Sequence, residues 1–287
     1  MPNQRDIRRR IRSVQSTQQI TKAMKMVSAA KLRRAQEGMI AARPYSGKMR
    51  EVLESLAARC DQSVHPLLHV RPEKRVLAVV VTADRGLCGG FNTNLIRFAN
   101  RWMKSRGEAG SDLKLVLVGR KGIDFFKRRS VPIEKRWAGI FQKVRYQDAA
   151  EIAQFLIDSY TREDCDAIYL IYNQFKSIIA QEIVAERLLP IPRSEGKAKE
   201  DQAEYLYEPD EQALFESLLP KHVTSQVFQA LLESGASEQG ARMTAMEGAT
   251  NNARDMIDRL TLFANRVRQA AITKEIIEIV SGAQALG

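Results

Sequence analysis

The fold is indicated first by the stretch Arg75-Val-Leu-Ala-Val-Val-Val-Thr82, a run that is mostly apolar and β-branched. A strand this apolar is buried on both faces, as in the interior of a parallel sheet. Two further stretches have the same character, Leu113-Lys-Leu-Val-Leu-Val-Gly119 and Ala167-Ile-Tyr-Leu-Ile-Tyr172. Helical patterns alternate with these strands, at residues 94–104, 123–128 and 149–160. The alternation predicts an α/β fold, with a Rossmann-like, doubly wound parallel sheet over residues 75–192.

Downstream of these strands, the composition marks the end of the predicted domain. A further extended piece, from Ser177 to Leu189, is followed by Pro190 and Pro192. The stretch from Arg193 to Glu204 is charged and has no apolar residues beyond two alanines, so it has little to bury. Residues 193–208 are therefore expected to form a mobile loop and connector.

Upstream of the sheet, residues 1–60 predict one long amphipathic helix. From Asp6 to Ala42 there is no proline and a single glycine. Spacings of three and four, typical of one helix face, relate most of the apolar residues Ile7, Ile11, Val14, Ile20, Met24, Val27 and Leu32. The polar run 15–19 interrupts this stripe and predicts a shift of register there. Pro44 predicts a kink, after which the helix continues to about Cys60.

Residues 209–287 predict a helical region that ends in a second long helix. Pro209 fits a helix start, Pro220 is expected to bend or split the helix, and Gly235 and Gly240 leave its continuity before Ala241 open. Residues 249–281 contain neither glycine nor proline, which corresponds to about 50 Å of uninterrupted helix. Its apolar stripe is wide enough to need another long helix as partner. The N-terminal helix has a suitable length, so the two are expected to form an antiparallel coiled coil.

The charge is unevenly distributed. The chain of 287 residues has a net charge of +11, and residues 1–60 hold 14 Lys and Arg against 4 Asp and Glu. Such a segment favours an acidic partner, which leaves nucleic acid, anionic lipid or an acidic protein surface open. The lack of aromatic residues before Tyr45 argues against stacking on single-stranded nucleic acid. The longest apolar stretch, residues 76–81, is too short to span a bilayer, and no direct membrane span is expected.

The glycine-rich turn after the first strand is the one place where an enzyme site had to be considered. Asp84-Arg-Gly-Leu-Cys-Gly-Gly-Phe-Asn92 fits neither the dinucleotide fingerprint nor the phosphate loop, because no Lys or Ser/Thr follows the last glycine. A structural turn is favoured, and Asp84 is expected to form an ion pair. The alternative is a nucleotide-binding α/β enzyme with helical arms. No catalytic residue, cofactor or metal is expected, since three separated cysteines and three histidines form no recognisable ligand set.

Several motifs, taken together in order along the whole chain, resemble the family of F-type ATP synthase gamma subunits. These motifs are Ile20-Thr-Lys-Ala-Met-Lys-Met-Val27, the turn 84–92, Tyr205-Leu-Tyr-Glu-Pro209, residues 241–252 and residues 268–275 with 278–283. The resemblance implies a non-catalytic rotor that transmits torque between a proton-driven ring of c subunits and a hexamer of alpha and beta subunits. It also implies contact with an epsilon subunit, no nucleic acid, and a peripheral location on the cytoplasmic face of a bacterial cell membrane. Nucleotide chemistry would belong to beta.

The resemblance also assigns roles to individual residues. Contacts with beta are implied for Met24, Lys25, Arg242, Gln269, Thr273 and Glu275. A foot near the c-ring and epsilon is implied for Arg43, Pro44, Tyr45 and Tyr205. An exposed basic helix facing acidic loops has a physical reason as well, because long-range attraction does not lock any one side-chain geometry.

Overall fold

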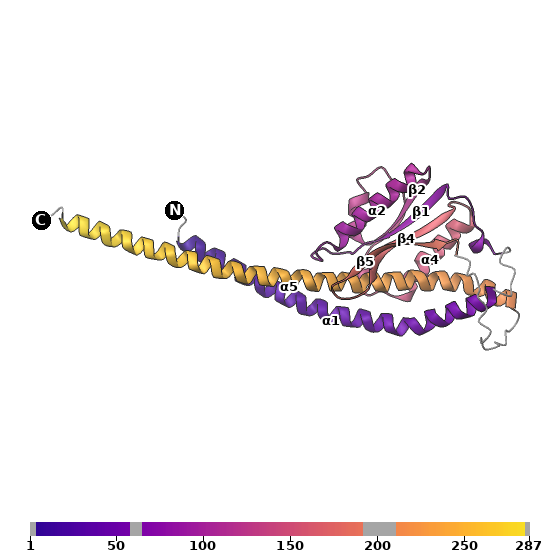
Figure 1. The fold of residues 1–287 in the computed structure, drawn as a ribbon, viewed down its shortest axis with the longest axis horizontal. Helices are drawn as coiled ribbons and strands as arrows, with labels where there is room; N and C mark the ends of the chain where they lie inside the picture. Colours follow the sequence, from indigo (N-terminus) through magenta and orange to yellow (C-terminus); the bar gives the residue numbers. More distant parts are fainter. Residues whose placement is uncertain (1–3, 58–64, 192–210, 285–287) are drawn as a thin grey trace. The chain divides into compact units, whose positions relative to one another are not determined.

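The computed structural model describes residues 4–57, 65–191 and 211–284 (Figure 1). They belong to two compact units: the helix-pair unit, Met1–Ser28 with Arg242–Gly287, and the sheet unit, Ala29–Ala241. The elements are α1 (Gln4–Ala57), η1 (Pro66–Leu68), β1 (Arg75–Val81), α2 (Phe91–Glu108), β2 (Asp112–Val118), α3 (Arg120–Phe126), β3 (Ile133–Trp137), η2 (Ile140–Gln142), α4 (Tyr146–Thr161), β4 (Ala167–Phe175), β5 (Gln181–Leu189) and α5 (Glu211–Gln284). The loop expected at 193–208 and the helix start expected at Pro209 lie outside the described residues, and the domain limits stay predictions.

The sheet unit contains one five-stranded sheet in the order β3-β2-β1-β4-β5. β1 pairs in parallel with β2 on one side and with β4 on the other, and β3 extends the sheet in parallel with β2. The predicted doubly wound parallel sheet is thereby confirmed. β5 runs antiparallel to β4, because the few residues between these strands form a hairpin and leave no room for a crossover helix.

β3 was not predicted from the sequence. This strand reads Ile133-Glu-Lys-Arg-Trp137, and only its first and last residues are partly buried. It lies at the edge of the sheet, where charged side chains can reach water, so it lacks the apolar run that identified the central strands.

Alternate side chains of the strands enter two separate cores, as the twofold period of a strand requires. On β1, Leu77, Val79 and Val81 face a core shared with α4 and with parts of α1 and α5. Ala78 and Val80 face the other core, which α2 and α3 complete. Figure 1 accordingly shows α2 on one side of the sheet and α4 and α5 on the other.

The two long helices both continue through an internal proline. α5 is one helix of 74 residues with Pro220 inside it, so the expected split does not occur. Leu219 and Val223, on either side of this proline, are fully packed in the core, and their burial offsets a proline cost of about 3 kcal/mol. Gly240 has a packing role, because a Cβ there would lie 3.3 Å from the Ile178 carbonyl oxygen. α1 likewise continues through Pro44 to Ala57.

In the helix-pair unit, α1 and α5 run antiparallel, as predicted. The Thr21 and Thr250 hydroxyls lie 2.8 Å apart, and Lys25 pairs with Glu247 at 2.6 Å, so residue numbers rise along one helix as they fall along the other. The predicted register shift in α1 is wrong. Alternating steps of three and four continue without a break through the less exposed positions Ile7, Ile11, Val14, Gln18, Thr21, Lys25 and Ser28. From Gln18 to Ser28, polar residues therefore occupy the contact positions, where apolar residues were expected.

Candidate functional site: the glycine-rich turn and the helix pair

Asp84 is the centre of the glycine-rich turn that follows β1. Its carboxylate accepts backbone N–H bonds from Arg120, Gly139 and Phe141, at 2.9 to 3.2 Å. These bonds hold the loops after β1, β2 and β3 together at the carboxyl edge of the sheet. The expected ion pair was the wrong interpretation of this charge, because the partners are backbone groups, which no side-chain pattern reveals.

A second contact between these loops lies two residues earlier along the chain, at Thr82. The buried Thr82 hydroxyl accepts a bond from Gly122 N–H at 2.8 Å and lies 3.1 Å from the Val118 carbonyl oxygen. Gly119 has a φ of +93°, and a Cβ there would lie 1.9 Å from the Thr82 carbonyl oxygen. Only glycine fits this close approach. The backbone N–H of Gly122, in the first turn of α3, is thus already engaged within the protein.

The crevice in which doubly wound sheets bind nucleotides is filled by α5. That crevice lies beyond the carboxyl ends of the strands at which the sheet order reverses, here β1 and β4. The Ser237 hydroxyl donates to the Asn173 carbonyl at the end of β4, and Ala241 packs on a cluster at the end of β1 formed by Ala83, Cys88 and Phe91. A helix of the chain itself therefore occupies the ligand position.

Reactive groups of the sheet unit are buried in structural roles. Cys88 is buried, and its Sγ accepts a bond from the Asn92 side chain at 3.2 Å. Burial raises the pKa of the Cys165 thiol to about 12, with Asp166 and Asp164 adding to the effect, so this thiol is not a nucleophile at neutral pH. Within the described ranges, no group of three His, Cys, Asp or Glu side chains is placed to hold a metal ion.

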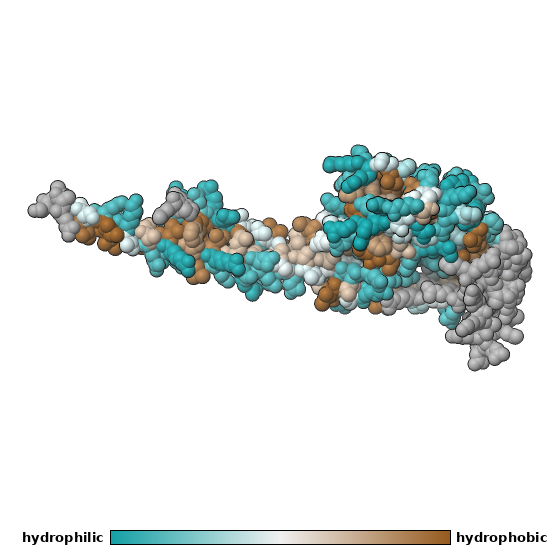
Figure 2. Space-filling view, turned by 45° about the horizontal axis from the view of Figure 1, so that its top comes forward, coloured by the Kyte–Doolittle hydropathy of each residue, from teal (hydrophilic) through white to brown (hydrophobic). Residues whose placement is uncertain are grey.

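The exposed end of α5 differs from the rest of the helix-pair unit. Matching the antiparallel register residue for residue places Gln4 opposite Val267 or Arg268. From Arg268 to Gly282 every residue of α5 is exposed, and Figure 1 shows this part extending beyond the start of α1. Its exposed large apolar side chains are Ile272, Ile276, Ile277, Ile279 and Val280. Figure 2 shows hydrophobic and hydrophilic patches side by side on this helix. A surface of this kind indicates a protein interface.

The residues implied as beta contacts fall into two groups. Gln269, Thr273 and Glu275 lie on the exposed end of α5, where the Thr273 hydroxyl donates to the Gln269 carbonyl. Met24 and Lys25 lie in the paired part, both partly buried, with Lys25 bound to Glu247.

Arg242, by contrast, is only 8% exposed, so within this chain it presents little surface to a partner. Of the implied foot, Pro44 and Tyr45 are exposed on α1. Arg43 belongs to α1, but its side chain, like all of Tyr205, lies outside the described part of the structure.

Two apolar residues of α1, Ile20 and Val27, were wrongly predicted to face α5. Ile20, Met26 and Val27 are each more than half exposed, although Ile20 and Val27 had been assigned to the stripe that faces α5. Extending the spacing of Ile7, Ile11 and Val14 strictly in steps of three and four would have placed Thr21 and Ser28 in the contact and these residues outside it.

No helix within the described ranges is long and apolar enough to cross a membrane.

Comparison with known sequences gives a consistent result over the full length of the chain. The sequence model of one family, described as ATP synthase, matches residues 3–286. The chain is 53% identical over 286 residues to the ATP synthase gamma chain of Geobacter sp. (strain M21). The matched region covers 100% of this chain and 99% of the relative. It is 52% identical to the ATP synthase gamma chain of Pelotomaculum thermopropionicum, with 100% of both chains covered.

Comparison with solved structures agrees. A chain in the central stalk and c-ring structure of Tetrahymena thermophila mitochondrial ATP synthase is 28% identical, with a TM-score of 0.62, covering 80% of this chain and 99% of that one. A chain in the structure of the Euglena gracilis mitochondrial ATP synthase that contains OSCP, F1 and the c-ring is 20% identical, with a TM-score of 0.68, covering 99% and 94%. At that identity the second likeness shows the fold alone.

Proposed function

Because the chain belongs to the family of ATP synthase gamma chains, we propose that it is the non-catalytic rotor shaft of a proton-driven ATP synthase. It transmits torque between a ring of c subunits and a hexamer of alpha and beta subunits, and so couples proton flow to ATP synthesis. The nucleotide chemistry takes place on the beta subunits. The alternative of a nucleotide-binding enzyme is not favoured, because α5 fills the crevice at the ends of β1 and β4.

The exposed end of α5 is the observation that supports this proposal. Residues 268–282 correspond to about 22 Å of helix at about 1.5 Å per residue, exposed on all sides and carrying large apolar residues such as Ile276 and Ile279. A lone helix of this length is marginal in water. It becomes a useful device when other subunits surround it and hold it in place. We assign that role to the alpha and beta hexamer, with Gln269, Thr273 and Glu275 as polar contacts to beta.

The basic face of α1 supports the same arrangement. Residues 1–60 carry a large excess of Lys and Arg, and side chains such as Arg33 and Lys48 are mostly exposed. Attraction between exposed charges depends only weakly on the exact distance and orientation of the two side chains. A shaft can therefore turn past acidic loops without being held at one angle. Met24 and Lys25 are the proposed beta contacts on this helix, whereas Arg242 on α5 is left out of this set because it is only 8% exposed.

The foot and the location complete the proposal. Arg43, Pro44, Tyr45 and Tyr205 are proposed to lie near epsilon and the c-ring, which would hold the chain at the cytoplasmic face of a bacterial cell membrane as a peripheral subunit. Pro44 and Tyr45 are exposed on α1 and therefore available for such a contact.

Co-purification from membranes tests the proposal. Affinity-tagged chain, extracted in mild detergent, is expected to recover alpha, beta, epsilon and c subunits. The triple substitution Ile272→Asp, Ile276→Asp and Ile279→Asp is expected to remove alpha and beta while epsilon and c remain, because carboxylates on this surface cannot be buried without a large desolvation cost.

The matched control replaces the same three residues by valine and is expected to keep the full set of subunits. Recovery of the untagged partners with the aspartate triple at the wild-type ratio would show that the end of α5 is not the contact with the hexamer. Failure of the wild-type chain to recover any of these subunits would refute the proposed function itself.

A further inference from the structure

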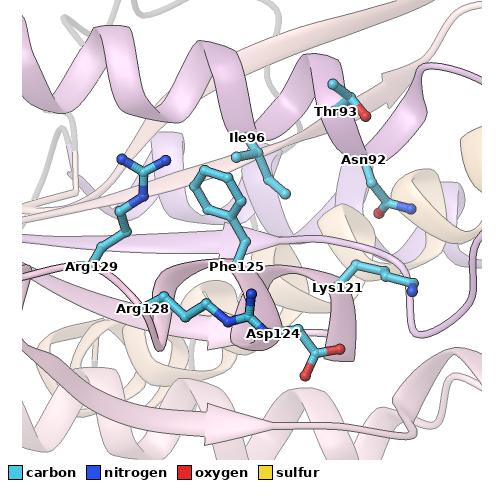
Figure 3. A pocket seen from close by; sticks show the side chains of 8 residues that line it. All are labelled: Asn92, Thr93, Ile96, Lys121, Asp124, Phe125, Arg128 and Arg129. Atoms are coloured by element: carbon cyan, nitrogen blue, oxygen red, sulfur yellow. The ribbon is translucent and has the colours of Figure 1, made fainter.

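A groove between α2 and α3, in the sheet unit, has no role in the proposed function. Its cavity volume is about 530 Å³, and Figure 3 shows its lining in close-up. The lining residues are Asn92, Thr93, Ile96, Lys121, Asp124, Phe125, Arg128 and Arg129.

The groove is positively charged. Three of its side chains are cationic and one, Asp124, is anionic, and Lys121, Arg128 and Arg129 are all exposed. Among the ion pairs of the described residues, none involves these three cations. The Arg129 guanidinium stacks over the Phe125 ring at 4.8 Å, an arrangement that orders the cation and leaves the N–H groups at the edge of its plane free to bind an anion.

The cations form two ends separated by a mostly apolar middle that also carries the Asp124 carboxylate. Lys121 lies near Asn92 and Thr93, in the first turn of α2, and the two arginines lie at the other end (Figure 3). The first turn of α2 has no acidic residue and no side-chain cap, so its partial positive charge adds to that of Lys121. Lys121 and Arg128 are seven positions apart, and because α3 ends at Phe126 only the first part of this interval is helical, so the two backbones lie on the order of 10 Å apart at about 1.5 Å per helical residue. Phe125 and Ile96 lie between the two ends, and the Asp124 carboxylate lies at the edge of this middle part, between Lys121 and Arg128.

A single phosphate matches this layout poorly. The N–H groups of Arg120, Lys121 and Gly122, which a phosphate would use at the start of α3, already bind Asp84, the Ala83 carbonyl and the Thr82 hydroxyl. One compact anion also cannot reach both cationic ends. An extended peptide spans about 10 Å in three residues, so two carboxylates at that spacing reach both ends while apolar side chains between them cover Phe125.

We propose that the α2–α3 groove binds an acidic segment of another polypeptide, in which two carboxylates three residues apart flank apolar residues. The charge and the two-ended shape of the groove select this class of partner over a small anion. The proposal does not depend on the rotor function, because the groove is made only of α2, α3 and the residues that follow α3.

The test uses the full chain and a fluorescein-labelled peptide, Gly-Glu-Leu-Leu-Glu-Gly, followed by fluorescence anisotropy at low salt. We expect saturable binding that weakens about fivefold in the double variant Lys121→Gln with Arg128→Gln, because each exposed ion pair contributes about 0.5 kcal/mol. The matched control, Arg97→Gln with Arg101→Gln, removes the same charge from exposed positions of α2 outside the groove and is expected to bind as the wild type does.

Two competitors complete the experiment. A peptide with both glutamates replaced by glutamine is expected to bind at least about fivefold more weakly, since it lacks both ion pairs, and inorganic pyrophosphate is expected to displace the labelled peptide only at much higher concentration. The proposal is overturned by absence of saturable binding, by equal losses in the two double variants, or by equal binding of the glutamine peptide. Tight binding of pyrophosphate that depends on Lys121 would make the groove a polyphosphate site instead.

Discussion

The sheet unit and the helix-pair unit have different kinds of interior. In the sheet unit, the central strand β1 is buried on both faces, and the core side chains of this strand, Val76 to Val81, are all aliphatic. In the helix-pair unit, the polar Thr21 and Ser28 are buried beside apolar residues such as Ile7. Ile20, Met26 and Val27 are exposed. The first arrangement maximises the apolar surface removed from water. The second gives up part of that stabilisation and keeps apolar side chains on the outside, where partner subunits can reach them.

This difference suggests how the work is divided between the two units. A close-packed sheet tolerates little change of shape, so it suits a part that has to transmit force without deforming. A helix pair whose contact mixes polar and apolar residues, with further apolar groups facing outward, suits a part whose stability is completed by its surroundings. Substitutions should therefore be costly in the sheet unit and mild in the isolated helix pair.

The largest expected effect is that of Gly119→Ala. A methyl group at this position would lie 1.9 Å from the Thr82 carbonyl oxygen, on a backbone with φ of +93°, and the free energy of unfolding should fall by at least about 3 kcal/mol. Gly107→Ala is the matched control, because a Cβ there meets nothing within 4 Å, and alanine in α2 should be neutral or slightly stabilising. Urea denaturation followed by circular dichroism measures the stability of both variants. Equal stabilities would contradict the close backbone contact assigned to Gly119 and Thr82.

Asp84→Ala is expected to cost less, about 2 kcal/mol, because three backbone N–H groups lose their acceptor and water reaches them only in part. Asp124→Ala, which removes an exposed carboxylate from α3, serves as the control and should be near neutral. If Asp84→Ala is as stable as Asp124→Ala in the same denaturation assay, then the carboxylate does not hold the three loops together.

Asp166→Asn should show a comparable loss that depends on pH. The Arg75 guanidinium, which bonds this carboxylate at 2.7 Å, lowers the pKa of Asp166 below its usual range. A lowered pKa stabilises the fold at pH values above the unfolded pKa, about 3.9, and this contribution disappears as pH falls through the folded pKa. The wild type should thus exceed the variant by about 2 kcal/mol at neutral pH.

That stability difference should shrink steadily below about pH 4. Denaturation curves of both proteins between pH 7 and pH 3 measure it. A difference that stays constant over this range would mean that the Asp166 charge does not contribute to stability.

The smallest effect is expected in the helix pair. Lys25 and Glu247 are both partly exposed at 2.6 Å, and a double-mutant cycle with Lys25→Gln and Glu247→Gln should give a coupling energy of about 0.5 kcal/mol. The coupling should decline in 0.5 M salt, where the Debye length is roughly 4 Å. A coupling above about 2 kcal/mol would place this pair in the class of buried networks and would remove the contrast between the two units.

The features that the sequence predicted share a physical origin. β1, β2 and β4 were predicted because central parallel strands are buried on both faces and read as continuous apolar runs. The antiparallel pairing of the terminal helices was predicted because a long apolar stripe requires a partner. Both signals are local in the sequence and come from large amounts of buried apolar surface.

The features that were missed depend on contacts between distant residues. β3 carries edge charges, and the continuity of α5 past Pro220 depends on packing of Leu219 and Val223 in the sheet unit. The bonds of Asp84 to backbone groups have no signature in side-chain patterns. The contact positions of α1 were misassigned because hydrophobicity was followed in place of strict spacing, although Thr21 and Ser28 lie at the correct intervals.

The central claim, that the outward surface of the helix pair faces beta as the shaft turns, is tested most directly by Met24→Lys. ATP hydrolysis and proton pumping are measured side by side in membrane vesicles that carry the substitution, with Lys31→Gln as a control that should change little. A lysine at Met24 adds a cation on the proposed beta-facing surface, and a new ion pair would hold one rotary angle against the others. We predict that hydrolysis persists while pumping falls. If both activities fall in proportion, or if neither changes, Met24 is a packing residue and the claim for this surface is contradicted.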